Sequence, residues 1–156
     1  MPEIAQVLSP GDVRLRVEAT SKRHLISEIA ATSARTFGLD QAAVVTALTE
    51  RERLGSTGVG HGVALPHARL PGVSRLLGLF WHLATPIEFD AIDDEPVDLV
   101  FVLLVPDDAE TMHLKTLAKI ARRLRDRELR NRLRQFEDPK AAWRALVGDP
   151  SVEAAA

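Results

Sequence analysis

Two histidines and a cluster of glycines lie in one stretch of the chain, residues 52–69, which reads ERLGSTGVGHGVALPHAR. Glycine adopts backbone conformations closed to other residues and lets a ligand come close to the main chain. His67 follows Val63–Pro66, a short apolar run that ends in proline. Because proline fixes its own φ and pushes the preceding residue toward an extended conformation, His67 is expected on a stiffened backbone. We place the chemistry at His67, at the end of a predicted strand.

The imidazole of His67 suits reversible phosphoryl transfer. A ring nitrogen can attack phosphorus, and the phosphoramidate that forms passes its phosphoryl group on readily. The other ring nitrogen must then be held by an acceptor, which fixes the tautomer. On residue type alone, a histidine in this position could equally be a hydrogen-bonding residue without a catalytic role.

Two further residues could serve an anion held at His67. Arg51 lies near the end of a helix predicted from Asp40 onward, and a guanidinium can meet a phosphoryl oxygen with paired N–H donors. The alternative is an ordinary surface arginine. His113 falls in the first turns of a helix predicted after Pro106, where unpaired backbone N–H groups favour an anion. It could also be a partly buried polar residue with no part in catalysis.

Two other kinds of site fit these residues less well. A metal ion could use His61, His67 and His113, but the spacing of the first two matches no familiar helical pair and no carboxylate lies between them. The glycines at 58, 60 and 62 are similar to those of a nucleotide loop, but the run lacks the GK[ST] ending and the strand and helix on either side. The sequence therefore predicts neither a metal nor a cofactor.

Composition narrows the class of protein. The 156 residues include no cysteine, which excludes disulfides and a thiol nucleophile, and the net charge of −2 disfavours nucleic-acid binding. The arginines between 122 and 134 are interpreted as a solvated helix face, with an acidic partner surface as the alternative. The N-terminus does not read as a signal peptide, and the longest apolar run, Val97–Val105, is too short to span a bilayer. We expect a cytoplasmic protein without membrane insertion.

Capping residues and apolar periodicity predict an alternating series of elements. Helices are expected at about residues 3–8, 21–38, 40–53, 107–124, 129–133 and 139–148, and strands at 13–17, 63–65, 76–83 and 97–105. Thr85–Pro96 is expected to be an acidic loop. This order predicts an α/β fold, with a mixed β-sheet flanked by helices on both faces in three layers. Residues 1–148 are expected to form a single domain, and residues 149–156 a disordered tail.

The motif GSTGVGHGVALPHAR closely resembles the IIA proteins of the fructose and mannitol class of the bacterial phosphotransferase system, and among them the nitrogen-regulatory branch. The later runs TPIEFDAIDDEPVDLVFVLLVP and MHLKTLAKIARRLRD also resemble that family, so the likeness covers about residues 3–147. His61 and Ala68 depart from the family pattern, which more often has Asn or a small polar residue at the first position and Gly at the second.

The resemblance implies the three-layer fold and a phosphohistidine at His67, with Arg51 and His113 as the neighbours that stabilise the phosphoryl group. It implies a phosphotransferase that takes its phosphoryl group from a phosphohistidine carrier protein of the HPr or NPr type and regulates target proteins by its phosphorylation state. Two alternatives remain. One is a sugar-specific IIA protein that passes the group to a IIB protein, and the other is a binding module without catalysis.

Overall fold

The computed structural model describes residues 3–109 and 111–148. Several helix ends follow local signals, and α2 is an example. The Ser21 hydroxyl accepts the His24 N–H at the start of α2, and Gly38 ends that helix at φ 70°. The helices are α1 (Ile4–Val7), the 3-10 turn η1 (Pro10–Asp12), α2 (Lys22–Phe37), α3 (Gln41–Arg53), α4 (Met112–Leu124), α5 (Arg127–Leu133) and α6 (Pro139–Val147). None of them, within the described residues, is long and apolar enough to cross a bilayer. The predicted tail, 149–156, lies outside the described residues.

Six strands form one mixed sheet in the order β1-β5-β6-β3-β2, with β4 pairing with β6 beyond β3. The central strand, β6, is antiparallel to β5 and parallel to both β3 and β4. The strands are β1 (Val13–Val17), β2 (Gly58–Gly60), β3 (Val63–Ala64), β4 (His67–Leu70), β5 (Leu77–Ile87) and β6 (Val97–Pro106). The nearly continuous apolar run of β6 is typical of a strand covered on both faces.

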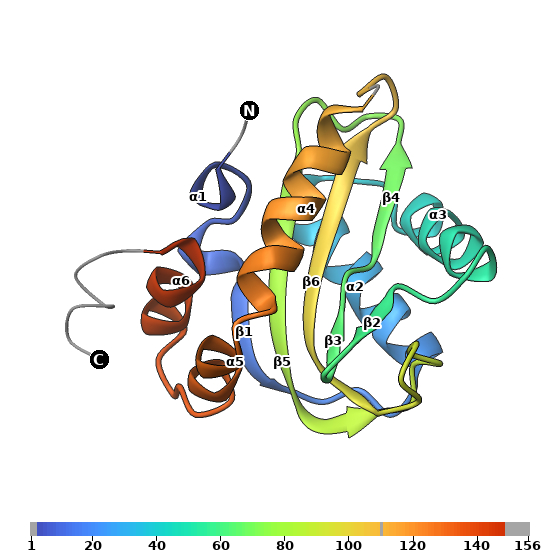
Figure 1. Ribbon diagram of the computed structural model, residues 1–156. Helices are drawn as coiled ribbons and strands as arrows, with labels where there is room; N and C mark the ends of the chain where they lie inside the picture. The colour runs from blue at the N-terminus through green and yellow to red at the C-terminus, as the bar shows by residue number, and fades with distance from the viewer. Residues whose placement is uncertain (1–2, 110, 149–156) are drawn as a thin grey trace.

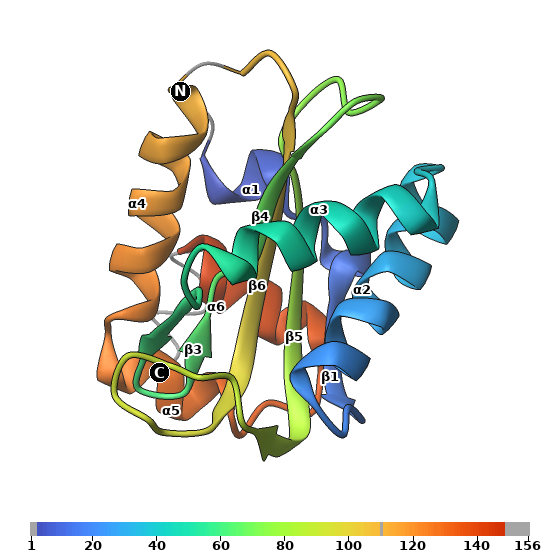
Figure 2. The same ribbon diagram turned by 90° about the vertical axis from the view of Figure 1, so that its right-hand side faces the viewer.

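Helices cover both faces of this sheet, as Figures 1 and 2 show. On one face α2 and α3 bury a core with the even-numbered side chains of β6, among them Val100, Val102 and Leu104. On the other face α1, α4, α5 and α6 pack on the odd-numbered side chains, among them Leu99, Phe101 and Leu103. The predicted three-layer α/β fold with a mixed sheet is therefore confirmed.

The predicted strands differ from the observed ones in three places. Gly58–Gly60, expected to be loop, pairs with β3 as a short edge strand. His67 begins β4 and does not end a strand: Pro66 has no N–H to donate, but its carbonyl accepts from Leu103 N, so pairing with β6 resumes at His67. The loop expected from Thr85 begins only after Ile87, because Ile87 pairs with Val97 across the turn into β6.

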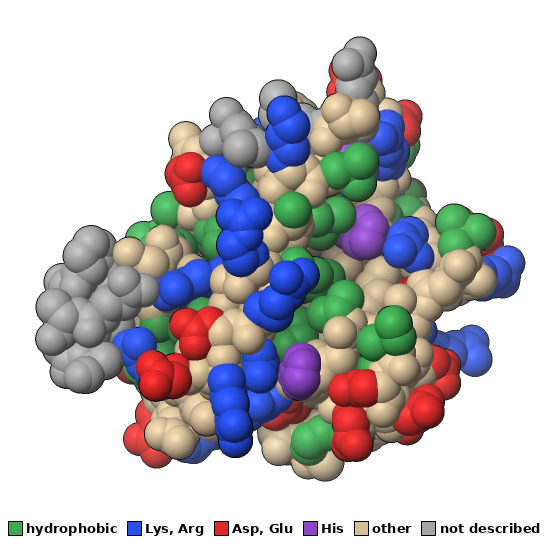
Figure 3. Space-filling view, in the orientation of Figure 1, with side chains coloured by type: hydrophobic (Ala, Val, Ile, Leu, Met, Phe, Trp, Pro, Cys, Tyr) green, Lys and Arg blue, Asp and Glu red, His purple; other side chains and the backbone are tan. Residues whose placement is uncertain are grey.

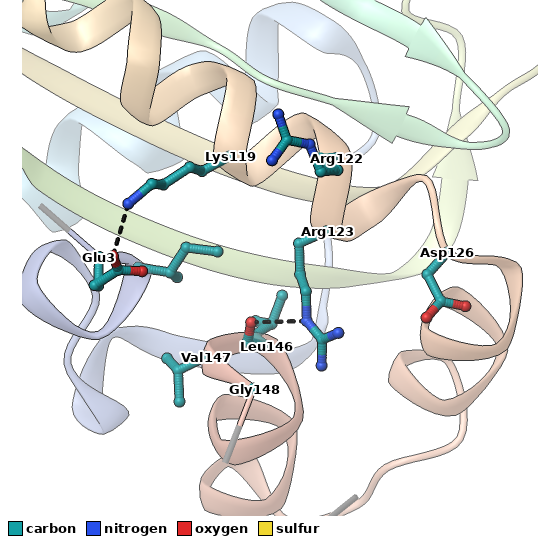
Figure 4. A pocket seen from close by; sticks show the side chains of 9 residues that line it. Glu3, Lys119, Arg122, Arg123, Asp126, Leu146, Val147 and Gly148 are labelled. Atoms are coloured by element: carbon teal, nitrogen blue, oxygen red, sulfur yellow. Dashed lines mark hydrogen bonds and ion pairs between the residues drawn. The ribbon is translucent and has the colours of Figure 1, made fainter. Parts of the chain in front are cut away.

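The interpretation of the arginines between 122 and 134 as a solvated face is wrong for three of them. Arg123 donates to the Leu146 carbonyl at 3.2 Å and also to the Ala145 carbonyl, and so closes the end of α6. In the hollow between α1, α4 and α6, Figure 4 shows this contact beside the ion pair of Lys119 with Glu3. Buried Arg130 donates to the Leu124 and Arg125 carbonyls, and Arg134 forms a two-pronged pair with Asp98.

Substitution of Gly58 tests the close packing of β2 against Ala91. A Cβ built on Gly58 would lie 2.9 Å from the backbone Cα of Ala91, whereas a Cβ on Gly11 meets no atom within 4 Å. We expect Gly58→Ala to lower the free energy of unfolding by about 1–3 kcal/mol through overpacking, and the control Gly11→Ala to change it by less than about 0.5 kcal/mol. Urea denaturation followed by tryptophan fluorescence would measure both, and equal stabilities would contradict this account.

Candidate functional site

His67 is the first residue of β4, and the alternation of a strand directs its side chain toward α4. Ala68 and Leu70 belong to the core under α2 and α3, so His67 and Arg69 point to the opposite face. The pairing of His67 with Leu103 of β6 sets its position along the sheet. The imidazole is half-buried and lines a pocket with residues of α3 and with His113 of α4. Figure 2 shows β4 at this side of the sheet, next to α3.

Two hydrogen bonds define the protonation of the His67 ring. Nδ1 lies 2.8 Å from the Leu65 carbonyl oxygen, which can only accept, so Nδ1 carries the hydrogen. In the neutral ring Nε2 is then the acceptor, and Arg51 donates its Nε–H to this atom across 3.3 Å. The ring therefore presents the lone pair of Nε2 to the pocket, directly beside a guanidinium.

Arg51 reaches His67 because it lies in the last turn of α3. Its Nη1 also donates to the Gly55 carbonyl at 2.9 Å, which ties the guanidinium to the turn that follows the helix. The carboxylates on either side of Arg51 are paired with other cations: Glu50 with Arg53 and Glu52 with Lys22, each at 2.9 Å. The charge of Arg51 thus faces neutral acceptors, a nitrogen lone pair and a carbonyl oxygen.

A pocket of about 450 Å³ opens over these two residues. His113, only 9% exposed, enters it from the first turn of α4, and Arg69 enters it from β4. Figure 3 shows this face, where a histidine side chain lies among hydrophobic and Lys or Arg side chains between α4 and α3. The lining residues are Ala47, Glu50, Arg51, Leu54, His67, Ala68, Arg69, Val105 and His113.

The surroundings of His67 lower the pKa of its imidazole below the ordinary value of 6.5. Burial of the ring is the main cause, because desolvation disfavours the charged form, and the positive charge of Arg51 acts in the same direction. The hydrogen bond to the Leu65 carbonyl and the charge of Glu52 oppose this shift. Near neutral pH the ring is therefore neutral and its Nε2 lone pair is available.

Of the predicted site residues, His67, Arg51 and His113 come together in one pocket, and their roles stay predictions. His61 does not line it: it occupies the turn between β2 and β3, where its N–H donates to Asp93 and its carbonyl accepts from Arg134. In the part of the chain that the structure describes, no three His, Cys, Asp or Glu residues gather as a possible metal site.

Sequence reasoning missed Arg69 and Leu54 as lining residues. Arg69 could have been found from strand alternation, since it lies two residues after His67 and must share its face. Leu54, which is 86% exposed, carries only a weak signal: an apolar residue beyond the end of an amphipathic helix.

Comparison with known proteins agrees with this geometry. Residues 6–147 match the family described as phosphoenolpyruvate-dependent sugar phosphotransferase system, EIIA 2. The nitrogen regulatory protein of Bradyrhizobium diazoefficiens is 41% identical over 97% of this chain and 99% of its own length. The crystal structure of nitrogen regulatory protein IIA-Ntr from Neisseria meningitidis superposes with a TM-score of 0.87 at 37% identity, covering 92% of this chain and 98% of that one. The mannitol IIA structure from Escherichia coli, at 19% identity over 89% of this chain and 98% of that one, shares the fold with a TM-score of 0.76.

These matches confirm the predicted family and its nitrogen-regulatory branch, and with them the expected phosphoryl-carrier type of protein. They compare whole chains and do not assign roles to single residues of the pocket.

The titration of His67 tests the electrostatics of the site. We expect its pKa, followed by NMR, to lie below 6.5, and Arg51→Met to raise it toward that value because a nearby positive charge is removed. Arg53→Met is the matched control, since Arg53 lies in the same helix turn but pairs with Glu50. Equal effects of the two substitutions would show that Arg51 does not act on the imidazole.

Proposed function

The chain belongs to the EIIA 2 family of the phosphoenolpyruvate-dependent sugar phosphotransferase system, and on this premise we propose that it accepts a phosphoryl group on Nε2 of His67. The donor is the phosphohistidine of a small carrier protein, and the phosphorylated form regulates partner proteins. The observation that carries this proposal is the Nε2 atom of His67, which is unprotonated, faces the pocket and lies 3.3 Å from the Arg51 guanidinium.

The transfer exchanges one phosphorus–nitrogen bond for another. The donor nitrogen keeps the electron pair of the bond that breaks, and the Nε2 lone pair of His67 forms the new bond. Nδ1 keeps its hydrogen throughout, so no proton has to leave the ring. Because the phosphorylated ring gains positive character, the hydrogen bond from Nδ1 to the Leu65 carbonyl becomes a stronger, charge-assisted one.

Positive groups of the pocket stabilise the transferred phosphoryl group. In the resting state the Arg51 Nε–H donates to the same lone pair that must attack, so the guanidinium shifts to a phosphoryl oxygen as the new bond forms. His113, in the first turn of α4, lies on the other side of the pocket, where the positive end of the helix dipole favours an anion. Positioning and charge stabilisation account for such a transfer without bond-making help from a metal.

Exposed apolar side chains beside the pocket favour docking of another protein. Leu54 lines the pocket after α3, and Leu114 follows His113 on α4; they are 86% and 54% exposed. Large aliphatic side chains exposed at the edge of a charged pocket are typical of a contact surface. A carrier protein that presents its phosphohistidine to His67 would cover them.

A phosphoryl group adds about 1.5 to 2 negative charges at neutral pH. Placed between Arg51 and His113 and beside Leu54, that charge alters the surface that partners meet, so binding can depend on phosphorylation. We propose regulated target proteins as the partners of this surface, in line with the name of the relative from Bradyrhizobium. Transfer of the group to purified IIB domains would instead identify a sugar-specific IIA protein.

Intact mass spectrometry, after the chain is mixed with the phosphorylated carrier protein, tests the proposed transfer to His67. We expect the chain to gain the mass of one phosphoryl group, and His67→Ala to gain none because the accepting nitrogen is gone. His61→Ala is the matched control, because His61 lies outside the pocket, and it should gain the group as the unaltered chain does. Labelling of His67→Ala, or no labelling of the unaltered chain, would refute the proposal.

Docking on Leu54 can be tested with two equally exposed residues. Leu54→Glu should reduce kcat/KM for the phosphorylated carrier at least about fivefold, because the charge must lose water in the contact. Ile92→Glu, at a residue that is 84% exposed and does not line the pocket, should leave it unchanged. Equal losses in the two variants would point to a contact surface elsewhere.

A further inference from the structure

The turn segment, residues 52–57, comprises the end of α3 and the residues that lead into β2, and it reaches Nδ1 of His67 through the main chain. The Thr57 carbonyl accepts the Leu65 N–H at 3.0 Å, and the Leu65 carbonyl accepts the Nδ1–H of the imidazole at 2.8 Å. Thr57 is itself buried. The position of Thr57 therefore sets the position of the one carbonyl that fixes the tautomer of His67.

The same turn also reaches Nε2. Its Gly55 carbonyl accepts from Nη1 of Arg51 at 2.9 Å, while Nε of Arg51 donates to Nε2 of His67. Each nitrogen of the imidazole is thus linked to the same short segment through one intermediate residue: Nδ1 through Leu65 and Nε2 through Arg51. A displacement of this segment would move both groups that hold the ring.

The buried carboxylate of Glu52 stabilises this segment through its contacts with Thr57 and Lys22. The Glu52 side chain is only 6% exposed, and Oε1 accepts the Thr57 N–H at 3.0 Å and an ion-pair contact from Lys22 at 2.9 Å. Oε2 accepts the Thr57 hydroxyl. A buried carboxylate with three donors is costly to disturb, because removal of one partner leaves charge without compensation.

Lys22, from the start of α2, is in turn held by Phe89. Its Nζ lies 4.4 Å from the centre of the Phe89 ring and 3.4 Å from the Phe89 carbonyl oxygen, which also accepts the Ser56 hydroxyl at 2.7 Å. Phe89 is fully buried. The cation that faces Glu52 is therefore anchored in the core under α2 and α3, and the turn is fixed to that core at both Glu52 and Ser56.

We propose that Glu52, held by Lys22, is a positioning residue for phosphoryl transfer: through Thr57 and Leu65 it keeps the hydrogen of His67 on Nδ1, and through the shared turn it keeps Arg51 at Nε2. This inference rests on the proposed function of His67. Glu52 touches neither the imidazole nor the phosphoryl group in this arrangement, and it acts only through the turn that it orders.

In variants of Glu52 or Thr57, the pKa of His67 distinguishes a loss of positioning of the imidazole from a general loosening of the site. Both the Leu65 hydrogen bond and the charge of Glu52 raise this pKa, whereas burial, the largest effect, lowers it. Loss of the Glu52 charge and of the Leu65 contact would therefore lower the pKa further. A site that merely loosens and lets water in would move the pKa up toward 6.5.

The test uses Glu52→Gln and Thr57→Val, with Glu28→Gln as the control for an exposed carboxylate paired with His24 on α2. NMR of the imidazole nitrogens in the unphosphorylated chain reports the tautomer and the pKa of His67. We expect both variants to lose the pure Nδ1–H tautomer and to show a lower pKa. The rate of phosphoryl acceptance should fall about tenfold to a hundredfold, and the control should match the unaltered chain.

Folded variants that keep the original tautomer, pKa and rate would overturn the proposal, and so would a pKa that rises toward 6.5. If Glu52→Gln does not fold, Thr57→Val decides, because it removes one hydroxyl and leaves the ion pair with Lys22 in place. If the unaltered chain accepts no phosphoryl group, the proposed function fails. The tautomer and the pKa still decide, without any donor, whether Glu52 positions His67.

Discussion

The hydrogen bond between Nδ1 of His67 and the Leu65 carbonyl keeps the ring hydrogen on Nδ1, and so leaves on Nε2 the lone pair that the proposed phosphoryl transfer needs. The bond spans only two residues, and Pro66 lies between them. Proline restricts the backbone at that point and has no N–H to compete for a carbonyl. The geometry of the nucleophile is therefore set by three consecutive residues, provided that the surrounding sheet holds them in place.

Two demands on the pocket reinforce each other. The phosphoryl dianion that we propose at His67 needs positive charge nearby, and the Arg51 guanidinium lies beside Nε2. Burial of the ring, together with the same charge, disfavours an imidazolium and lowers the pKa of His67, so the ring stays neutral near neutral pH. The arrangement that would stabilise the proposed phosphohistidine thus also keeps the imidazole of the free protein neutral.

The site lies at the edge of the sheet, where β4 pairs with β6 and the two helical layers, represented by α3 and α4, come close to each other. Each layer contributes one group: α3 supplies Arg51, and α4 supplies His113. The mannitol IIA structure shares the fold at 19% identity, so the fold persists through wide change in sequence. Because a fold does not by itself fix a function, we expect the choice of partner to depend on side chains around the pocket, such as the exposed Leu54 and Leu114, and not on the sheet.

Local sequence signals were enough for much of the fold. α2 begins after Ser21 and ends at Gly38, and α6 begins after Asp138 and ends at Gly148. The apolar run of β6 indicates the central strand. Each of these signals acts within a few residues. The motif around His67 likewise indicated the family, and it predicts His67 as the reactive residue. Only the tertiary structure decided the contacts between distant segments: the extension of β5 to Ile87, the approach of Arg51 to His67, and the burial of Glu52 against Lys22. Those contacts arise from the packing of helices on a shared sheet, which no local propensity encodes.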